Sequence, residues 1–147
     1  MTTRKLRILL VDDSPEDCRL IQELVATCAK DLEITVCHSG EEALKRLKDC
    51  HSEHCPDLLL LDLNLPGMNG FEVLESIRSH ERTRSTPVTI MTTSTAERDV
   101  KKAYGLGANS FISKPFGIDH LCRTLKAIED FWGGASRLPP KPGAAAA

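Results

Sequence analysis

Two hydrophobic patterns alternate along the chain. Short apolar runs typical of buried strands occur at 6–11, 32–37, 58–61, 88–91 and 110–113. Between and after them, apolar residues recur at helical spacing, which predicts helices over about 15–28, 41–47, 71–77, 96–106 and 121–131. This alternation predicts an α/β fold: a doubly wound, five-stranded parallel sheet with helices on both faces.

The domain organisation follows from where the periodic pattern ends. Residues 1–132 have room for one domain with its own core. Residues 133–147 are mainly Gly, Ala and Pro and carry little that could be buried, so we expect a disordered tail there.

Composition and charge exclude several classes of protein. The 147 residues are 41% hydrophobic and 27% charged, which argues against a disordered chain, and the net charge is −2, unlike a strongly basic nucleic-acid binder. No apolar run approaches the ~20 residues that span a bilayer. The stretch Leu6–Val11 is too short for a signal peptide. We therefore expect a cytoplasmic protein with no nucleic-acid or membrane partner.

The six cysteines do not by themselves indicate a disulfide framework, because the chain is large enough to form an apolar core. Cys18, Cys28 and Cys122 fall within helical patterns, where we expect free, buried thiols that behave as small hydrophobes. The segment Cys50-His-Ser-Glu-His-Cys55 contains soft zinc ligands, but their spacing is unusual for zinc. An ordinary solvated loop is the favoured interpretation of that segment, and structural zinc is the alternative.

Polar residues with complementary charges follow four of the expected strands. Asp12 and Asp13 follow the first strand, Asp62 the third, Thr92 the fourth and Lys114 the fifth. Because functional groups of such sheets gather at the carboxyl ends of the strands, these side chains should share one pocket. Three crowded carboxylates favour a bound Mg²⁺. A carboxylate beside a metal, an ammonium and a hydroxyl suits phosphoryl transfer, with the carboxylate as the nucleophile.

Four motifs in this order resemble the receiver domain of two-component response regulators. They are the acid pair in Leu10-Val-Asp-Asp13, the segment 61–70 (LDLNLPGMNG), Thr92 after a strand led by proline, and Lys114-Pro115-Phe116. The resemblance covers about residues 5–132 and implies a CheY-like, flavodoxin-like fold.

The resemblance implies a role for each matching residue. Asp62 would accept a phosphoryl group from a sensor histidine kinase, and Lys114 would pair with that group. Asp12 and Asp13, together with Asp62 and the backbone carbonyl of Asn64, would hold Mg²⁺. The matching motifs also imply that Thr92 hydrogen-bonds the phosphoryl group as a switch residue, that Phe111 turns inward on activation, and that the Lys114–Pro115 bond is cis.

The identity of the switch hydroxyl depends on strand register, because Thr92 and Thr93 are adjacent and a slip of one residue reverses their facing. An ungapped match to the family from Asp62 to Lys114 selects Thr92, with Thr93 as the alternative.

One subgroup shares further features with this chain. The row Thr92-Thr93-Ser94 and the aromatic pair Phe131-Trp132 resemble the small single-domain regulators that act with phytochrome-type histidine kinases. This likeness implies a homodimer to which Phe131 and Trp132 contribute, in line with the frequent use of exposed aromatic pairs at interfaces.

Three other functions remain open at this point. A phosphorelay intermediate would pass the phosphoryl group to a histidine phosphotransfer protein. A small Mg²⁺-dependent aspartyl-phosphate phosphatase usually needs a second acid two residues after the nucleophile, where this chain has Asn64. An adaptor that keeps only the fold would not need Asp62 and Lys114 together.

Overall fold

A computed structural model describes residues 5–51, 54–114 and 117–141. Strands and helices alternate, as the hydrophobic pattern predicts. In chain order the elements are β1 (Leu6–Val11), α1 (Pro15–Cys28), β2 (Leu32–Cys37), α2 (Gly40–Asp49), β3 (Leu58–Leu61), α3 (Gly70–Ser79), β4 (Val88–Thr92), α4 (Glu97–Gly105), β5 (Ser110–Ser113), α5 (Ile118–Asp130) and a short π-helix, η2 (Phe131–Ala135).

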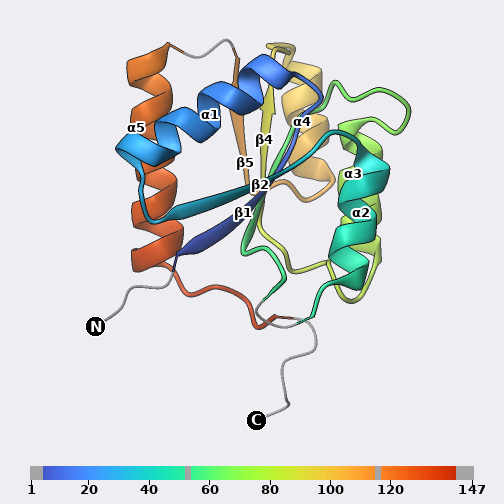
Figure 1. The fold of residues 1–147 in the computed structure, drawn as a ribbon. Coiled ribbons are helices and arrows are strands. Elements are labelled where there is room, and N and C mark those ends of the chain that lie inside the picture. Colours follow the sequence, from blue (N-terminus) through green and yellow to red (C-terminus); the bar gives the residue numbers. More distant parts are fainter. Residues whose placement is uncertain (1–4, 52–53, 115–116, 142–147) are drawn as a thin grey trace.

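The strands form one parallel sheet in the order β2-β1-β3-β4-β5. Helices α1 and α5 cover one face, and α2, α3 and α4 cover the other (Figure 1). Successive residues of a strand point to opposite faces of the sheet. Leu59 and Leu61 pack in the hydrophobic core under α2 and α3, whereas Leu58 and Leu60 pack in the core under α1 and α5. The predicted doubly wound fold, with helices on both faces, is confirmed. None of the described helices has the length and apolar character to cross a membrane.

The strand order places a topological switch point between β1 and β3. The chain leaves β1 toward β2 on one side, and β3 lies on the other side of β1. The loops after β1 and β3 therefore run to opposite faces and leave a crevice at the carboxyl edge of the sheet. The acids that follow these two strands lie at this edge.

The C-terminal segment contacts the body of the protein beyond the expected domain end at residue 132. Leu138 packs against the core between the sheet and α1 and α5. Lys141 pairs with the buried Asp57 at 2.5 Å and donates a hydrogen bond to the backbone carbonyl of Cys55 at 2.6 Å. The expected disordered tail, 133–147, thus includes residues 133–141 with defined contacts, and 142–147 lie outside the described residues.

Four of the cysteines form disulfides, which corrects the expectation of free thiols at Cys28 and Cys122. Cys28 bonds to Cys122, whose Cα lies 5.8 Å away, although 94 positions separate them in sequence. Neither residue has a bonding partner nearby in the sequence, and the pairing arises from the packing of α1 on α5. The expectation of a free buried thiol is confirmed for Cys18.

The second disulfide joins Cys50 to Cys55, so neither interpretation of this segment anticipated its main feature. The two sulfurs bond to each other, which removes both thiolates from a zinc site. His51 and His54 are exposed. A separation of five residues is short enough for the two cysteines to come within bonding distance, so the spacing of Cys50 and Cys55 in the sequence permits this disulfide.

Candidate phosphoacceptor site

Three carboxylates meet at the carboxyl edge of the sheet. One oxygen each from Asp12, Asp13 and Asp62 lies within 4.8 Å of the others. Asp12 and Asp62 are 1% and 6% exposed, whereas Asp13 is open to solvent. Among the described residues this is the group of acids, histidines and cysteines that could hold a metal ion. The structure thus brings together three of the predicted metal-binding side chains.

Local hydrogen bonds fix the two buried acids. The backbone N–H of Ser14 donates to Asp12 Oδ1 at 2.9 Å, as α1 begins. The backbone N–H of Asn64 donates to Asp62 Oδ1 at 3.0 Å in the loop after β3. In each carboxylate, Oδ1 therefore accepts a hydrogen bond from the backbone N–H two residues later in the chain, and Oδ2 accepts a hydrogen bond from Lys114.

The Lys114 ammonium, directly after β5, binds the acid group from the other side. Its Nζ lies 2.6 Å from Asp12 Oδ2, 2.8 Å from Asp17 Oδ2 and 3.3 Å from Asp62 Oδ2. The Lys114 side chain is 4% exposed, so water screens these contacts little. The single ammonium leaves the four nearby carboxylates with an excess of negative charge, which favours a bound cation.

The pKa values of the site reflect this crowding. Burial raises the pKa of Asp12, and the hydrogen bond from Lys114 opposes that shift. Burial alone would lower the pKa of Lys114, but the carboxylates of Asp12 and Asp17 outweigh it and raise the pKa above its ordinary value. Lys114 is therefore a fixed positive charge at neutral pH.

Asp17 also belongs to the site, although the pattern of residues at the strand ends does not predict it. It lies in the first turn of α1, where its backbone N–H donates to the N-cap Ser14 Oγ at 3.3 Å. The sequence signal for Asp17 is weak, because an acidic residue in the first turn of a helix is common without any binding role.

Two hydroxyls and one amide line the other side of the acids. Thr92, the last residue of β4, is fully buried, whereas Thr93 is exposed. Asn64 Nδ2 donates to both hydroxyl oxygens at 3.2 Å. The side chain of Asn64 therefore connects the loop after β3 to the end of β4, and the choice between Thr92 and Thr93 as switch stays a prediction.

A close backbone approach shapes the loop that carries Asp62 and Asn64. A Cβ at Gly70 would lie 2.4 Å from the carbonyl oxygen of Asp62 and 2.6 Å from the Cα of Leu63. The next element, α3, begins with a capping box between Asn69 and Glu72. Glycine at 70 thus lets the start of α3 pack directly on the acceptor loop.

The remaining predicted residues lie outside the acid group. Phe111 is half-buried in β5 and packs on the core of α2, α3 and α4. Phe131 is 54% exposed and makes an edge contact with Trp132, with ring centroids 5.1 Å apart. The predicted cis bond involves Pro115, which is outside the described residues, as is Phe116.

The sheet order, the acid group and its lysine define the class of this protein: a receiver domain of two-component signalling. The chain belongs to the response regulator receiver domain family, whose model matches residues 8–126.

Relatives with similar sequences share this architecture. The response regulator Rcp1 of a Synechocystis species is 37% identical over 135 residues, which cover 90% of this chain and 92% of Rcp1. The crystal structure of the phosphorylated cyanobacterial phytochrome response regulator RcpA matches with a TM-score of 0.81 and 37% identity, covering 92% of this chain and 99% of that one. The Mn²⁺-bound form of Rcp1 matches with a TM-score of 0.78 and 37% identity, covering 90% and 98%. These comparisons confirm the resemblance to the small phytochrome-associated regulators.

Proposed function

We propose that this protein is a single-domain response regulator in which Asp62 accepts a phosphoryl group from a sensor histidine kinase. The observation that carries the proposal is the contact of Lys114 Nζ with Asp62 Oδ2 at 3.3 Å, inside a pocket with two further buried or half-buried acids. A structural ion pair would need one carboxylate, whereas this ammonium faces three.

The transfer step uses atoms that the site positions. An oxygen of Asp62 attacks the phosphorus of a phosphohistidine, the P–N bond breaks, and an acyl phosphate forms. Asp12 and Asp17 hold the Lys114 ammonium at the pocket, where it pairs with the oxygens of the transferred group. The Thr92 hydroxyl oxygen accepts a hydrogen bond from Asn64, so its own proton would be available for the oxygens of the transferred group.

The acid group fits Mg²⁺, which prefers oxygen ligands and keeps several waters. Asp12, Asp13 and Asp62 would supply carboxylate oxygens, and the carbonyl of Asn64 would be a further ligand. When bound, Mg²⁺ neutralises charge on the transferring phosphoryl group. The related Rcp1 has been crystallised in a Mn²⁺-bound form, which supports the binding of a divalent cation by this chain.

The partners follow from the similarity and from the exposed aromatic pair. The likeness to RcpA, a phytochrome response regulator, supports a phytochrome-type histidine kinase as the phosphoryl donor. The 54% exposure of Phe131 beside Trp132 supports a homodimer contact at η2. Phosphorylation would shift the balance of two conformations and change the protein surface offered to a downstream target.

A phosphotransfer experiment tests this function. Autophosphorylated histidine kinases, including phytochrome-type ones, are mixed with the wild-type chain, Asp62→Asn and the control Asp99→Asn. We expect label on the wild type and on Asp99→Asn, and none on Asp62→Asn, since only the last lacks the acceptor carboxylate. Equal labelling of all three chains would contradict the assignment of Asp62.

A further inference from the structure

The cysteines of this protein occupy two kinds of environment. Cys18 and Cys37 are free and lie in the core at 4% and 0% exposure. Burial is the main cause that raises the pKa of each thiol to about 11. Few thiolates form at such sites, so these two cysteines are poor nucleophiles. The other four cysteines form the two disulfides, and of these Cys28, Cys50 and Cys122 are partly exposed, whereas Cys55 is buried.

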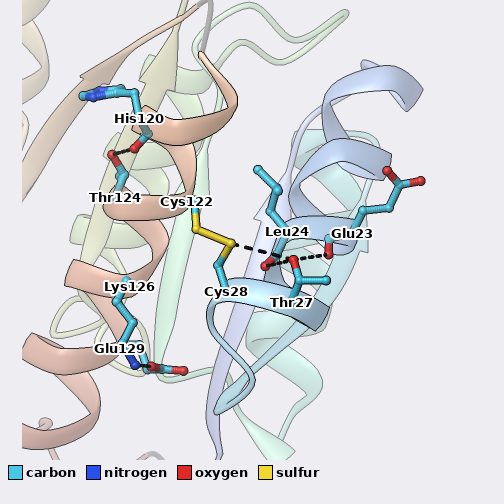
Figure 2. Close-up of a disulfide and its surroundings, with 9 residues drawn as sticks. All are labelled: Glu23, Leu24, Thr27, Cys28, His120, Cys122, Thr124, Lys126 and Glu129. Carbon is cyan, nitrogen blue, oxygen red and sulfur yellow. Dashed lines mark hydrogen bonds and ion pairs between the residues drawn. A yellow bond between two sulfur atoms is a disulfide. The ribbon is translucent and has the colours of Figure 1, made fainter.

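The Cys28–Cys122 disulfide joins two helices that are far apart in the sequence. Cys28 is the last residue of α1, and Cys122 lies in the second turn of α5 (Figure 2). Both residues are only partly buried. The Thr27 hydroxyl lies 3.7 Å from Cys28 Sγ, and its proton is donated to the backbone carbonyls of Glu23 and Leu24. Because neither residue is fully buried, we expect a small reagent to reach this sulfur pair from solvent.

The fold does not need this bond to close its core. Ile21 and Val25 of α1 lie in one buried cluster with Leu121 and Leu125 of α5. These side chains exclude water between the helices whether or not the sulfurs are joined. The two cysteines should therefore stay neighbours when reduced, with their backbones already at bonding separation, a Cα–Cα distance of 5.8 Å.

We propose that Cys28 and Cys122 form a reversible redox-modification site that exchanges with small-molecule disulfides such as oxidised glutathione. A thiolate of the pair attacks the reagent disulfide, forms a mixed disulfide and releases one small thiol. The second protein thiolate then attacks the mixed disulfide and releases the other small thiol. The protein pair loses two electrons and two protons, which reduce one reagent disulfide to two thiols.

Oxidation at this site ties α5 to α1. Helix α5 follows β5 and Lys114, and α1 carries Asp17, which pairs with Lys114. The covalent bond at Cys28–Cys122 and the ion pair at Asp17–Lys114 therefore both join α1 to the β5–α5 region of the chain. The oxidised protein should resist separation of α5 from α1 more than the reduced protein does.

The experiment equilibrates the folded full-length chain in glutathione buffers of graded redox ratio. Free thiols are then alkylated and counted by intact mass, and peptide mapping separates the Cys28–Cys122 pair from Cys50–Cys55. We expect Cys28 and Cys122 to gain or lose alkylation together as the ratio changes, while Cys18 and Cys37 stay unmodified. We also expect reduction of this pair to lower the thermal midpoint by roughly 10 °C, from the loop-closure effect of a long loop. The variant Cys50→Ser/Cys55→Ser isolates this shift, and Cys28→Ser/Cys122→Ser should lack it.

Three outcomes would overturn the proposal. Alkylation of both residues in the most oxidising buffer would show that no disulfide forms. Independent alkylation of one residue would show that they are not a pair. Protection of both in the most reducing buffer would show a bond that does not exchange. None of these measurements requires phosphorylation of the protein. A result that contradicts the redox proposal would therefore leave the proposed phosphoacceptor function untouched.

Discussion

Asp13 is the exposed member of the acid group, and its replacement by Asn tests the metal site without opening a cavity. The side chain keeps its shape and loses one negative charge. In the absence of metal, that charge lies within 4.8 Å of Asp12 and Asp62 oxygens and repels both carboxylates. With Mg²⁺ present, the same charge would attract the ion. The substitution should therefore change stability in opposite directions under the two conditions.

The magnitudes follow from Coulomb's law and from ligand linkage. Two unit charges 4.8 Å apart repel by about 1 kcal/mol in water and by about 3 kcal/mol at an effective dielectric of about 20. Because Asp13 is exposed, we expect Asp13→Asn in EDTA to raise the free energy of unfolding by about 1 kcal/mol. Mg²⁺ at about 100 times its dissociation constant adds about 2.7 kcal/mol to the wild type. If the variant binds about 100-fold more weakly, it gains only about 0.4 kcal/mol.

Urea unfolding in EDTA and in Mg²⁺ measures both effects. We expect the variant to be the more stable chain in EDTA and the wild type to be the more stable in Mg²⁺. Glu23→Gln is the matched control, because it removes the same charge from an exposed position on α1 and should leave the Mg²⁺ effect unchanged. An equal Mg²⁺ stabilisation of wild type and Asp13→Asn would refute the reasoning.

Three further changes have defined outcomes. Lys114→Met should lower the free energy of unfolding in EDTA by about 3 kcal/mol, because the substitution leaves buried carboxylates without their ammonium partner. Urea denaturation measures this change, and an unchanged free energy of unfolding would show that the ion pairs of Lys114 contribute nothing to stability. Gly70→Ala should cost about 3 kcal/mol in the same assay, because its Cβ would overlap the Asp62 backbone, and a neutral effect would contradict the close approach. Burial raises the pKa of Glu129, but hydrogen bonds from Lys126 and from the backbone N–H of Asp31 outweigh burial and lower it below the ordinary value of 4.5. The ionised Glu129 carboxylate therefore stabilises the fold above pH 4.5, and this stabilisation is lost as the pH falls through the lowered pKa. Glu129→Gln should therefore be about 1 kcal/mol less stable than wild type at pH 7, with the gap closing in acid; a gap that stays constant in a pH series of unfolding curves would count against it.

The hydrophobic pattern predicts most of the fold because the central strands β1, β3 and β4 are buried on both faces and therefore form nearly continuous apolar runs. The run Leu58–Leu61 can only be a central strand or a buried helix segment, and its length selects the strand. The hydrophobic pattern predicts the ends of helices less accurately than their existence. Helix α2 ends at Asp49 and not at the predicted Leu47, since the polar residues of its last turn do not contribute to the hydrophobic pattern.

The site could be predicted where it depends on strand ends and not where it depends on helix packing. Asp12, Asp62 and Lys114 each follow a strand, and parallel strands bring their ends to one edge. Asp17 and the Cys28–Cys122 bond depend on how α1 sits against β5 and α5. That placement is set by side-chain packing between distant segments, which the periodicity of a single segment does not specify.

The central claim is that the chain's own site transfers a phosphoryl group to Asp62, and intact-mass measurement with a small acyl phosphate donor tests it most directly. In Mg²⁺ we expect the wild type to gain the mass of one phosphoryl group, located by peptide mapping at Asp62, and to lose the signal in EDTA. Asp62→Asn should gain nothing under either condition. Equal phosphorylation in EDTA, or a phosphoryl group located on another residue, would contradict the account.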